Sequence, residues 1–106
     1  MKTHPWLTTL IFCCALPVQA GGLSVARQQD LTHFVRQECG FCHGLKLTGG
    51  LGSSITAEAL KNKPAETLIA AILHGIPGTA MPGWAPHLSE ADTAWIVDEL
   101  LKGFPE

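Results

Sequence analysis

The sequence predicts a small all-α domain with three main helices, in a chain of 106 residues. Three segments place apolar residues at the spacing of one helical face, and residues typical of helix ends bound each of them. No stretch alternates apolar and polar residues as a half-buried strand does. A chain of this length accommodates one folded domain and excludes a large enzyme with a separate cofactor domain.

The first helix is predicted from about Ser24 to Glu38. Ser24 suits the N-cap, because its hydroxyl can accept a hydrogen bond from the first turn. The apolar stripe consists of Leu31, Phe34 and Val35. This helix would lead directly into Cys39, and His33 is expected on its exposed face.

The second helix is predicted from about Pro64 to His74. Pro64 suits the first helical position, where no backbone N–H is needed, and Gly75 suits the end of the helix. Its apolar face consists of Leu68, Ile69, Ile72 and Leu73.

The third helix is predicted from about Glu90 to Lys102. Ser89 and Asp92 have the spacing of a capping pair, and Gly103 ends the segment. The apolar face consists of Ile96, Val97, Leu100 and Leu101. Trp95 falls off that face, so it either packs on a second surface or is partly exposed.

Residues 1–20 have the layout of a secretory signal peptide. A basic Lys2 precedes an apolar stretch from Leu7 to Leu16, and small residues follow up to Ala20. The stretch is shorter than the roughly 18 residues that span a bilayer. We therefore expect cleavage after Ala20, export to the periplasm, and a mature domain of residues 21–106 without a membrane span.

A lipid-modified Cys13 is the alternative for this leader. Phe12 disfavours it, because such signals need a small residue directly before the cysteine. Cleavage after Ala20 would remove Cys13 and Cys14 and leave Cys39 and Cys42 as the cysteines of the mature domain.

The decisive motif is Cys39-Gly40-Phe41-Cys42-His43, which has the C-x-x-C-H pattern of c-type haem attachment. Two thiols at this spacing can add to the two vinyl groups of a haem and form thioethers. The adjacent His43 imidazole then binds the iron from one side. The export signal agrees with this interpretation, because c-type haem is attached outside the bacterial cytoplasm. We expect one covalent haem c per chain and a largely unfolded chain without it.

Three other interpretations of the cysteine pair are weaker. A thioredoxin-like redox pair would lie in a βαβ pattern, which is absent from the sequence around the motif. A zinc site would need a second cysteine pair, and none follows. A plain disulfide between Cys39 and Cys42 would close a very small loop.

Met81 is expected to be the second axial ligand. It is the only methionine besides Met1, and proline and glycine around it exclude a regular core element. Pro82 restricts Met81 to an extended conformation, which helps to aim its thioether. His74 and His87 are the competing ligands, but we expect His74 at a helix C-terminus and His87 in a solvated loop.

A turn-rich loop follows the haem motif, from Gly44 to Asn62. Its glycines do not form a phosphate-binding loop, because no Lys-Ser/Thr pair follows and no strand precedes it. We expect the loop to cross the His43 side of the haem, with one of its carbonyls accepting a hydrogen bond from His43 Nδ1–H. Thr56 to Leu60 is expected to form a short helical turn.

The order of these features resembles class I cytochrome c over essentially the whole mature chain. Within that class the chain is most similar to the cytochrome c-55X family, through Arg36–Gly52 around the haem motif and Pro77–Trp84 around the methionine. The resemblance implies a small fold of three main helices around one covalent haem. It also implies thioethers at Cys39 and Cys42 and axial iron ligation by His43 and Met81.

The family resemblance also implies a role in denitrification. Its members are small periplasmic cytochromes implicated either as electron donors to the haem cd nitrite reductase or in maturation of its d-type haem. Because both axial positions would be filled, we expect outer-sphere transfer of single electrons and no enzymatic activity. The alternatives are assistance in d-type haem maturation and a gas-binding haem protein, which would need an open sixth site.

Three positions depart from the family's pattern. Leu31 stands where class I members often have glycine on the first helix, and Glu99 where they often have an aromatic residue on the last. The usual crossing of these helices is therefore expected to change, with Trp95 replacing part of it. Many members have proline at the position of Ser53, which leaves the loop acceptor for His43 open.

The charge pattern bears on partners. A formal net charge of −2 excludes the strongly basic footprint of a nucleic-acid-binding protein. Two interpretations remain open for Lys46, Lys61 and Lys63, which are either a docking ring around an exposed haem edge or a solvated face. Trp84 is expected to pack against the haem or to cover a partner site. We expect a monomer that meets redox proteins transiently.

Overall fold

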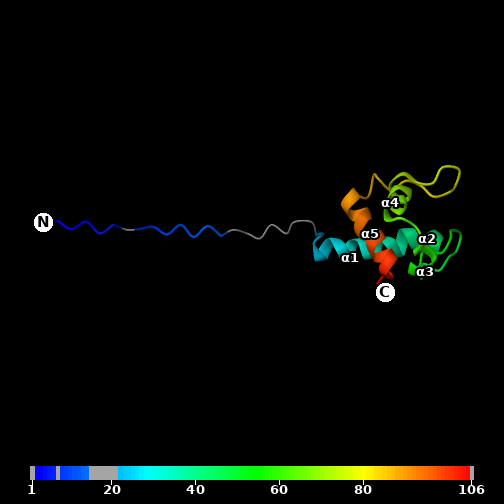
Figure 1. The fold of residues 1–106 in the computed structure, drawn as a ribbon, viewed down its shortest axis with the longest axis horizontal. Helices are drawn as coiled ribbons and strands as arrows, with labels where there is room; N and C mark the ends of the chain where they lie inside the picture. The colour runs from blue at the N-terminus through cyan, green and yellow to red at the C-terminus, as the bar shows by residue number, and fades with distance from the viewer. Residues whose placement is uncertain (1, 7, 15–21, 106) are drawn as a thin grey trace.

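A computed structural model of the chain describes residues 2–6, 8–14 and 22–105. Over this part of the chain the secondary structure is entirely helical, which confirms the all-α prediction (Figure 1). The described residues of the leader form no helix and are exposed. The predicted cleavage site after Ala20 lies outside the described residues.

One continuous helical segment leads into the haem motif. It consists of α1 (Val25–Phe34), a π-helical turn η1 (Val35–Cys39) and α2 (Gly40–His43). Ser24 caps it as predicted, since its hydroxyl accepts from the backbone N–H of Arg27 at 3.1 Å. The predicted end at Glu38 is wrong. The helix continues to His43, because Gly44, with φ of 91°, is the first residue that leaves the helical conformation.

Two helices follow the turn-rich loop. The predicted short turn is α3 (Ala57–Leu60), capped by the Thr56 hydroxyl. The next helix is α4 (Ala65–His74), so the prediction that Pro64 is its first helical residue is wrong. Pro64 is the N-cap, because its ψ of 139° is extended while its carbonyl already accepts the first helical hydrogen bonds.

The last helix, α5 (Glu90–Lys102), has the predicted bounds. Ser89 and Asp92 form the predicted capping pair reciprocally. Each backbone N–H donates to the other side chain at 3.0 Å. Two backbone N–H groups at the start of α5 that have no partner within the helix are thereby hydrogen-bonded.

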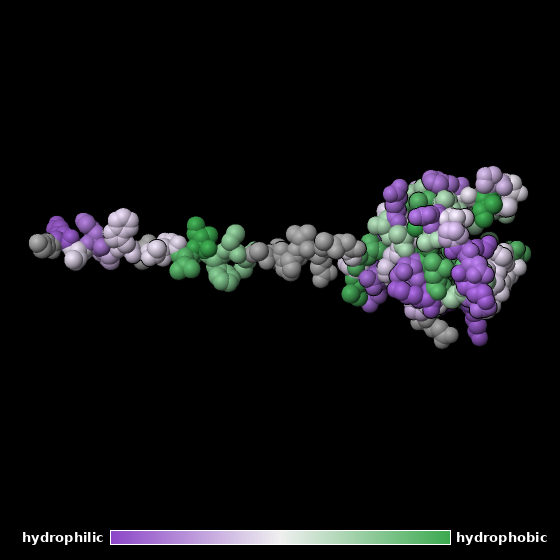
Figure 2. Space-filling model, viewed as in Figure 1, coloured by the Kyte–Doolittle hydropathy of each residue, from purple (hydrophilic) through white to green (hydrophobic). Residues whose placement is uncertain are grey.

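The core lies where α5 meets the other helices. Helix α5 packs against α1, α3 and α4, and these helical segments cross around the core (Figure 1). The buried apolar cluster consists of Leu31, Val35, Leu47, Leu60, Leu88, Ile96 and Leu100. On the visible outer face of the helical part, hydrophilic and hydrophobic side chains are interspersed (Figure 2). No helix among the described residues is long and apolar enough to cross a membrane.

Aliphatic side chains of α1 and α5 share one buried cluster, and Trp95 packs against it. Leu31 is 1% exposed and belongs to the same buried cluster as Ile96. Trp95 is half-buried and meets the ring of Phe104 edge-on, with centroids 6.4 Å apart. A bulky aliphatic side chain therefore fills the crossing itself, and the aromatic pair lies at its flank.

A polar clamp also joins α1 to α5. Arg27 donates two hydrogen bonds to the Asp92 carboxylate, from Nε at 3.0 Å and from a terminal nitrogen at 2.7 Å. The hydrogen bond from Arg27 lowers the pKa of Asp92 to about 2, and the bonds within the Ser89 cap act in the same direction. The clamp fixes the helix that leads to the haem motif against the last helix.

Candidate haem site

The haem motif lies at the end of the helical segment, immediately after an irregular turn. Cys39 closes the π-helical turn η1, and Cys42 and His43 lie on α2. A π-turn holds one more residue than an α-turn and occurs frequently at functional sites. It changes the angular position of the motif relative to the buried stripe of α1.

Both motif cysteines are half-buried free thiols. Burial raises the pKa of the Cys39 thiol to about 11, with a smaller contribution from neighbouring Glu38. The neutral thiol is therefore the dominant form of Cys39 at neutral pH. In the described part of the chain, no group of three His, Cys, Asp or Glu residues is arranged to hold a bare metal ion.

The His43 ring is oriented by the loop that follows it. Its Nδ1 lies 2.6 Å from the carbonyl oxygen of Ser53. Because a carbonyl only accepts, Nδ1 carries the hydrogen and Nε2 keeps the lone pair that a metal ligand needs. This confirms the expectation that a carbonyl of the Gly44–Asn62 loop accepts from His43, and it identifies the acceptor as Ser53.

Backbone hydrogen bonds hold this loop against α2. Gly49 N–H donates to the His43 carbonyl at 2.8 Å, and Gly52 N–H donates to the Cys42 carbonyl at 2.7 Å. A Cβ at Gly52 would lie 3.0 Å from His43 Nδ1. Glycine suits this position because the backbone passes directly beside the imidazole ring, which would have to shift slightly to admit a Cβ.

Met81 lies in the loop between α4 and α5 and is half-buried. Backbone hydrogen bonds attach the far end of this loop to the last turn of α4, including one from Ala85 N–H to the Leu73 carbonyl at 3.1 Å, and another closes the loop on itself. Trp84 N–H donates to the Ile72 carbonyl at 2.8 Å, and Ile76 N–H donates to the Met81 carbonyl at 3.4 Å. At Gly75, with φ of +73°, a Cβ would lie 2.8 Å from the Met81 carbonyl oxygen. Met81 lies outside any helix, as the prolines and glycines around it predict.

The remaining histidines lie where the sequence places them. His33, His74 and His87 are all exposed, and His74 ends α4. Of the four histidines in the described residues 22–105, His43 alone is half-buried. The structure therefore keeps His74 and His87 at the surface.

Two contacts near the site were not found by sequence reasoning. Trp84 packs edge-on against Phe34, with ring centroids 5.2 Å apart, and so joins the Met81 loop to α1. Arg36 donates hydrogen bonds to the carbonyls of Leu45 and Pro105. No local signal predicts the Arg36 contacts, because Pro105 lies 69 residues further along the chain.

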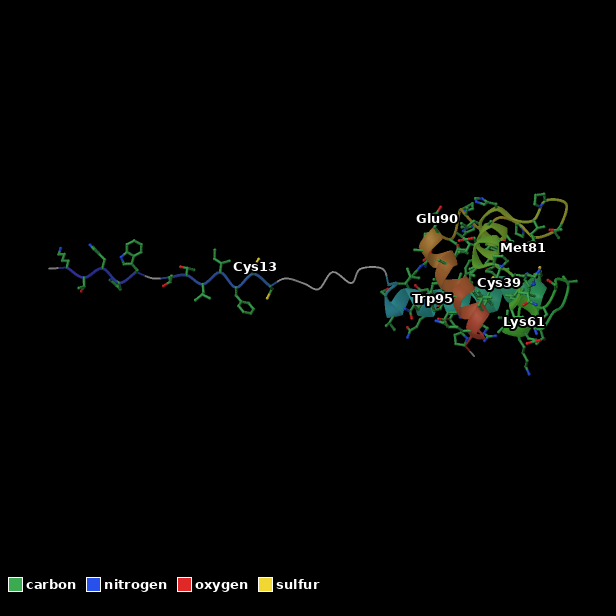
Figure 3. The ribbon with its side chains drawn as sticks, viewed as in Figure 1. Cys13, Cys39, Lys61, Met81, Glu90 and Trp95 are labelled. Atoms are coloured by element: carbon green, nitrogen blue, oxygen red, sulfur yellow. The ribbon has the colours of Figure 1, made fainter. Side chains whose placement is uncertain are left out.

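Lys61 lies apart from Met81 and is paired with an acidic neighbour. Lys61 forms an ion pair with Glu58 at 2.6 Å, and both side chains are exposed. In Figure 3 the Lys61 side chain points away from the helical body, on the side opposite to the labelled Met81. The solvated face is therefore the better interpretation for Lys61.

The donor groups suit a c-type haem. The α2 end offers two half-buried thiols and one imidazole whose Nε2 is available, while the Met81 loop offers a half-buried thioether. Figure 3 shows Cys39 on the helical segment and Met81 on the loop beside α4. Thiols attach haem c covalently, and His with Met is a known axial pair for its iron. The residues present fit this cofactor.

Comparison with known proteins gives a consistent result. Residues 26–98 match the family model described as "Cytochrome C oxidase, cbb3-type, subunit III". The chain is 52% identical over 97 residues to a cytochrome c55X of Stutzerimonas stutzeri, covering 92% of this chain and 83% of that protein. It is 54% identical over 96 residues to a cytochrome c55X of Paracoccus denitrificans, covering 91% of this chain and 93% of that protein.

Solved structures extend the comparison. A structure of the c-type cytochrome NirC is 51% identical, covers 76% of this chain and 94% of that chain, and has a TM-score of 0.74. The dihydro-heme d1 dehydrogenase NirN, in complex with DHE, is 34% identical with a TM-score of 0.64. The match covers 70% of this chain and 16% of NirN. A dihydro-heme d1 dehydrogenase of Pseudomonas aeruginosa is 36% identical over 92 residues, which are 86% of this chain and 18% of that protein.

Proposed function

This chain belongs to the cytochrome c55X family of c-type cytochromes, and from that premise we propose that it carries single electrons in denitrification, toward the nitrite reductase system. Membership of the family implies covalently bound haem c. The observation that best supports the proposal is the His43 ring, whose Nδ1 is held by the Ser53 carbonyl at 2.6 Å. That bond leaves Nε2 free to act as an axial ligand of fixed orientation.

Each donor residue has a distinct role in this proposal. The Cys39 and Cys42 thiols would hold the haem covalently through thioether bonds to its vinyl groups. His43 Nε2 and the Met81 sulfur would be the protein ligands of its iron. When bound, haem c supplies an iron that changes between Fe(II) and Fe(III) and so carries one electron.

Filled axial positions favour electron transfer over catalysis. The chain's own residues then orient the ligands, exclude water and present a docking surface, and no substrate needs to reach the iron. One C-x-x-C-H motif in the sequence supports one haem per chain. The proposed site of action is the periplasm, with residues 1–20 removed as a signal peptide and a monomer of residues 21–106 remaining.

Two measurements test the carrier role. A spectroelectrochemical titration of the exported protein is expected to follow a one-electron curve. The visible spectrum of the reduced protein is expected to stay unchanged when carbon monoxide is added, because Met81 holds its position. Rapid formation of a carbon monoxide adduct would instead support the gas-binding alternative.

The exported form itself is tested by its mass and its N-terminus. Intact mass is expected to correspond to residues 21–106 plus one haem, and N-terminal sequencing is expected to begin at Gly21. A chain that retains residues 1–20 would contradict the signal-peptide assignment.

A second role is supported by the similarity to dihydro-heme d1 dehydrogenases, in which a region like this chain forms 18% of a longer protein. Dehydrogenation of a dihydro-haem releases two electrons and two protons per ring. Two copies of a one-electron carrier would accept those electrons, and this would give the chain a role in d-type haem maturation.

A deletion in the bacterium that encodes the chain separates the two roles. Nitrite reductase protein that lacks d-type haem would support maturation. Fully assembled reductase that receives too few electrons would support donation.

A further inference from the structure

One side chain adds to the backbone hydrogen bonds that close the Met81 loop, which run from Thr79 N–H to the Ile76 carbonyl at 3.1 Å and from Ile76 N–H to the Met81 carbonyl at 3.4 Å. Thr79 donates from its hydroxyl to the Ile76 carbonyl at 2.7 Å. The same oxygen accepts the backbone N–H of Met81 at 3.3 Å. Among the described residues, no other side chain forms a hydrogen bond to the backbone of residues 75–84.

The composition of the loop leaves few alternatives to this bridge. Pro77 and Pro82 have no N–H, so they donate nothing to the loop's backbone hydrogen bonds. The Met81 carbonyl accepts from Ile76 N–H, and the Met81 N–H is satisfied by Thr79 alone. Both backbone polar groups of Met81 are therefore tied to the Ile76–Thr79 turn, one of them through the hydroxyl.

Thr79 has little packing to lose. Its side chain is exposed and takes no part in the buried apolar cluster. A change at this position is therefore expected to leave the helices and their core intact. The effect falls on the backbone of Met81, whose side chain is flexible and has no hydrogen-bond donor of its own.

We propose that Thr79 is the positioning residue for Met81, and that its hydroxyl determines how firmly the thioether is held at the sixth coordination position. The inference rests on the proposed function, because it takes Met81 as an axial ligand. Removing the hydroxyl would leave the Met81 N–H bonded to water in place of the turn, and would loosen its hold on the backbone. The open form, with the thioether displaced, would then be more populated.

The test uses the reduced, exported holo-protein and carbon monoxide as the probe of an open sixth site. Thr79→Val keeps the branched shape and removes the hydroxyl. It is expected to form the carbon monoxide adduct about tenfold faster than the unchanged protein, the effect of losing the two hydrogen bonds that the hydroxyl makes. Thr79→Ser restores the hydroxyl and is expected to return the rate to that of the unchanged protein.

Two controls complete the experiment. Thr32→Val removes a hydroxyl that also donates to a backbone carbonyl, Gln28 at 2.8 Å, but lies on α1 away from the loop. It is expected to have no effect on the rate. If Thr79→Val also matches the unchanged protein, the positioning role is overturned, and Thr79→Ala repeats the comparison should the valine variant fold poorly.

Met81→Ala separates this inference from the function on which it rests. It is expected to bind carbon monoxide at once, since no thioether competes. If Met81→Ala reacts no faster than the unchanged protein, Met81 is not the sixth ligand and the proposed function fails together with the inference. If Met81→Ala reacts fast and Thr79→Val does not, the inference alone fails.

Discussion

The two candidate axial ligands are held in different ways. His43 lies at the end of a helix, and its side chain is itself hydrogen-bonded, from Nδ1 to the Ser53 carbonyl at 2.6 Å. Met81 lies in a loop, and the hydrogen bonds that fix it all end on its backbone. The structure orients one ligand directly and the other only through the chain that carries it.

The chemistry of the two side chains explains the difference. An imidazole has two nitrogens, so one can be oriented by the protein while the other binds the metal. A thioether has no donor, accepts only weakly, and follows three rotatable bonds. A methionine ligand must therefore be aimed by a stiff backbone, and we expect the Met81 side to be the weaker of the two.

The largest difference is expected when each ligand is removed. His43→Ala should abolish accumulation of holo-protein, because it removes the ligand next to the attachment cysteines. Met81→Ala should keep its covalent haem, which intact mass spectrometry detects. Equal amounts of haem on both variants would contradict the comparison.

The next largest effect on the free energy of unfolding is expected when alanine replaces the glycine that lies against each ligand in space, Gly75 against Met81 and Gly52 against His43. Gly75→Ala places a Cβ 2.8 Å from the Met81 carbonyl oxygen and 2.9 Å from Gly83 N, at a φ of +73°. Backbone cannot move aside easily, so we expect a loss of about 3 kcal/mol in the free energy of unfolding. Gly52→Ala meets the His43 ring at 3.0 Å, a contact that a shift of a few tenths of an ångström relieves, and is expected to cost about 1 kcal/mol. Denaturant unfolding of the holo-proteins measures both.

Gly78→Ala is the matched control for Gly75. Its φ is +80°, but a Cβ there has nothing within 4 Å. Gly78→Ala therefore measures the cost of backbone strain without a steric clash, and we expect it to lower the free energy of unfolding by about 1 kcal/mol. If Gly75→Ala costs no more than Gly78→Ala, the close packing of the Met81 loop on α4 contributes nothing to stability.

Acid should weaken the helix that carries His43 while leaving the Met81 loop in place. The pKa of Asp92 is lowered from 3.8 to about 2 by the hydrogen bond from Arg27. A lowered pKa stabilises the folded state above the ordinary value, and this contribution disappears as the pH falls from about 4 to about 2. Asp92→Asn should cost about 2 kcal/mol at pH 7 and flatten this part of the stability curve.

Unfolding at several pH values measures the Asp92 effect, and carbon monoxide binding provides the contrast. Because the clamp joins α1 to α5, the adduct should form at an unchanged rate in Asp92→Asn at pH 7. Faster carbon monoxide binding in Asp92→Asn would contradict this, because it would show that the α1–α5 clamp and the Met81 loop are coupled through α5.

The smallest effect is expected at Lys61. Its ion pair with Glu58 is exposed on both partners, at 58% and 82%. Such pairs contribute little, so Lys61→Gln should change the free energy of unfolding by less than about 0.5 kcal/mol. The sequence from Thr67 to Ser89, which contains the Met81 loop, has no Lys, Arg, Asp or Glu. The carbon monoxide rate should therefore also be unaffected by this variant and by added salt.

Local chemistry made much of the molecule predictable from the sequence. The α5 bounds follow from the reciprocal Ser89–Asp92 cap and from Gly103, which act within a few residues of each helix end. The C-x-x-C-H motif brings the candidate attachment thiols and a candidate iron ligand together in five adjacent residues. Met81 could be selected because it is the only methionine beyond the first residue and lies among prolines and glycines.

Other features depend on where distant segments meet. The helix continues past Glu38 to His43 and accommodates a π-turn, which its residue spacing did not predict. Ser53 became the acceptor for His43 only when the loop folded back over ten residues. Trp84 on Phe34 and Arg36 on Leu45 and Pro105 likewise join separate segments.

The sequence by itself therefore determined the helices and the set of donor atoms, because caps, periodicity and motif spacing act within one or two turns. The tertiary structure decided how those donors are aimed. A side chain that bonds a carbonyl 10 or 69 residues away does so only after the chain has folded, and no local pattern encodes such a partner.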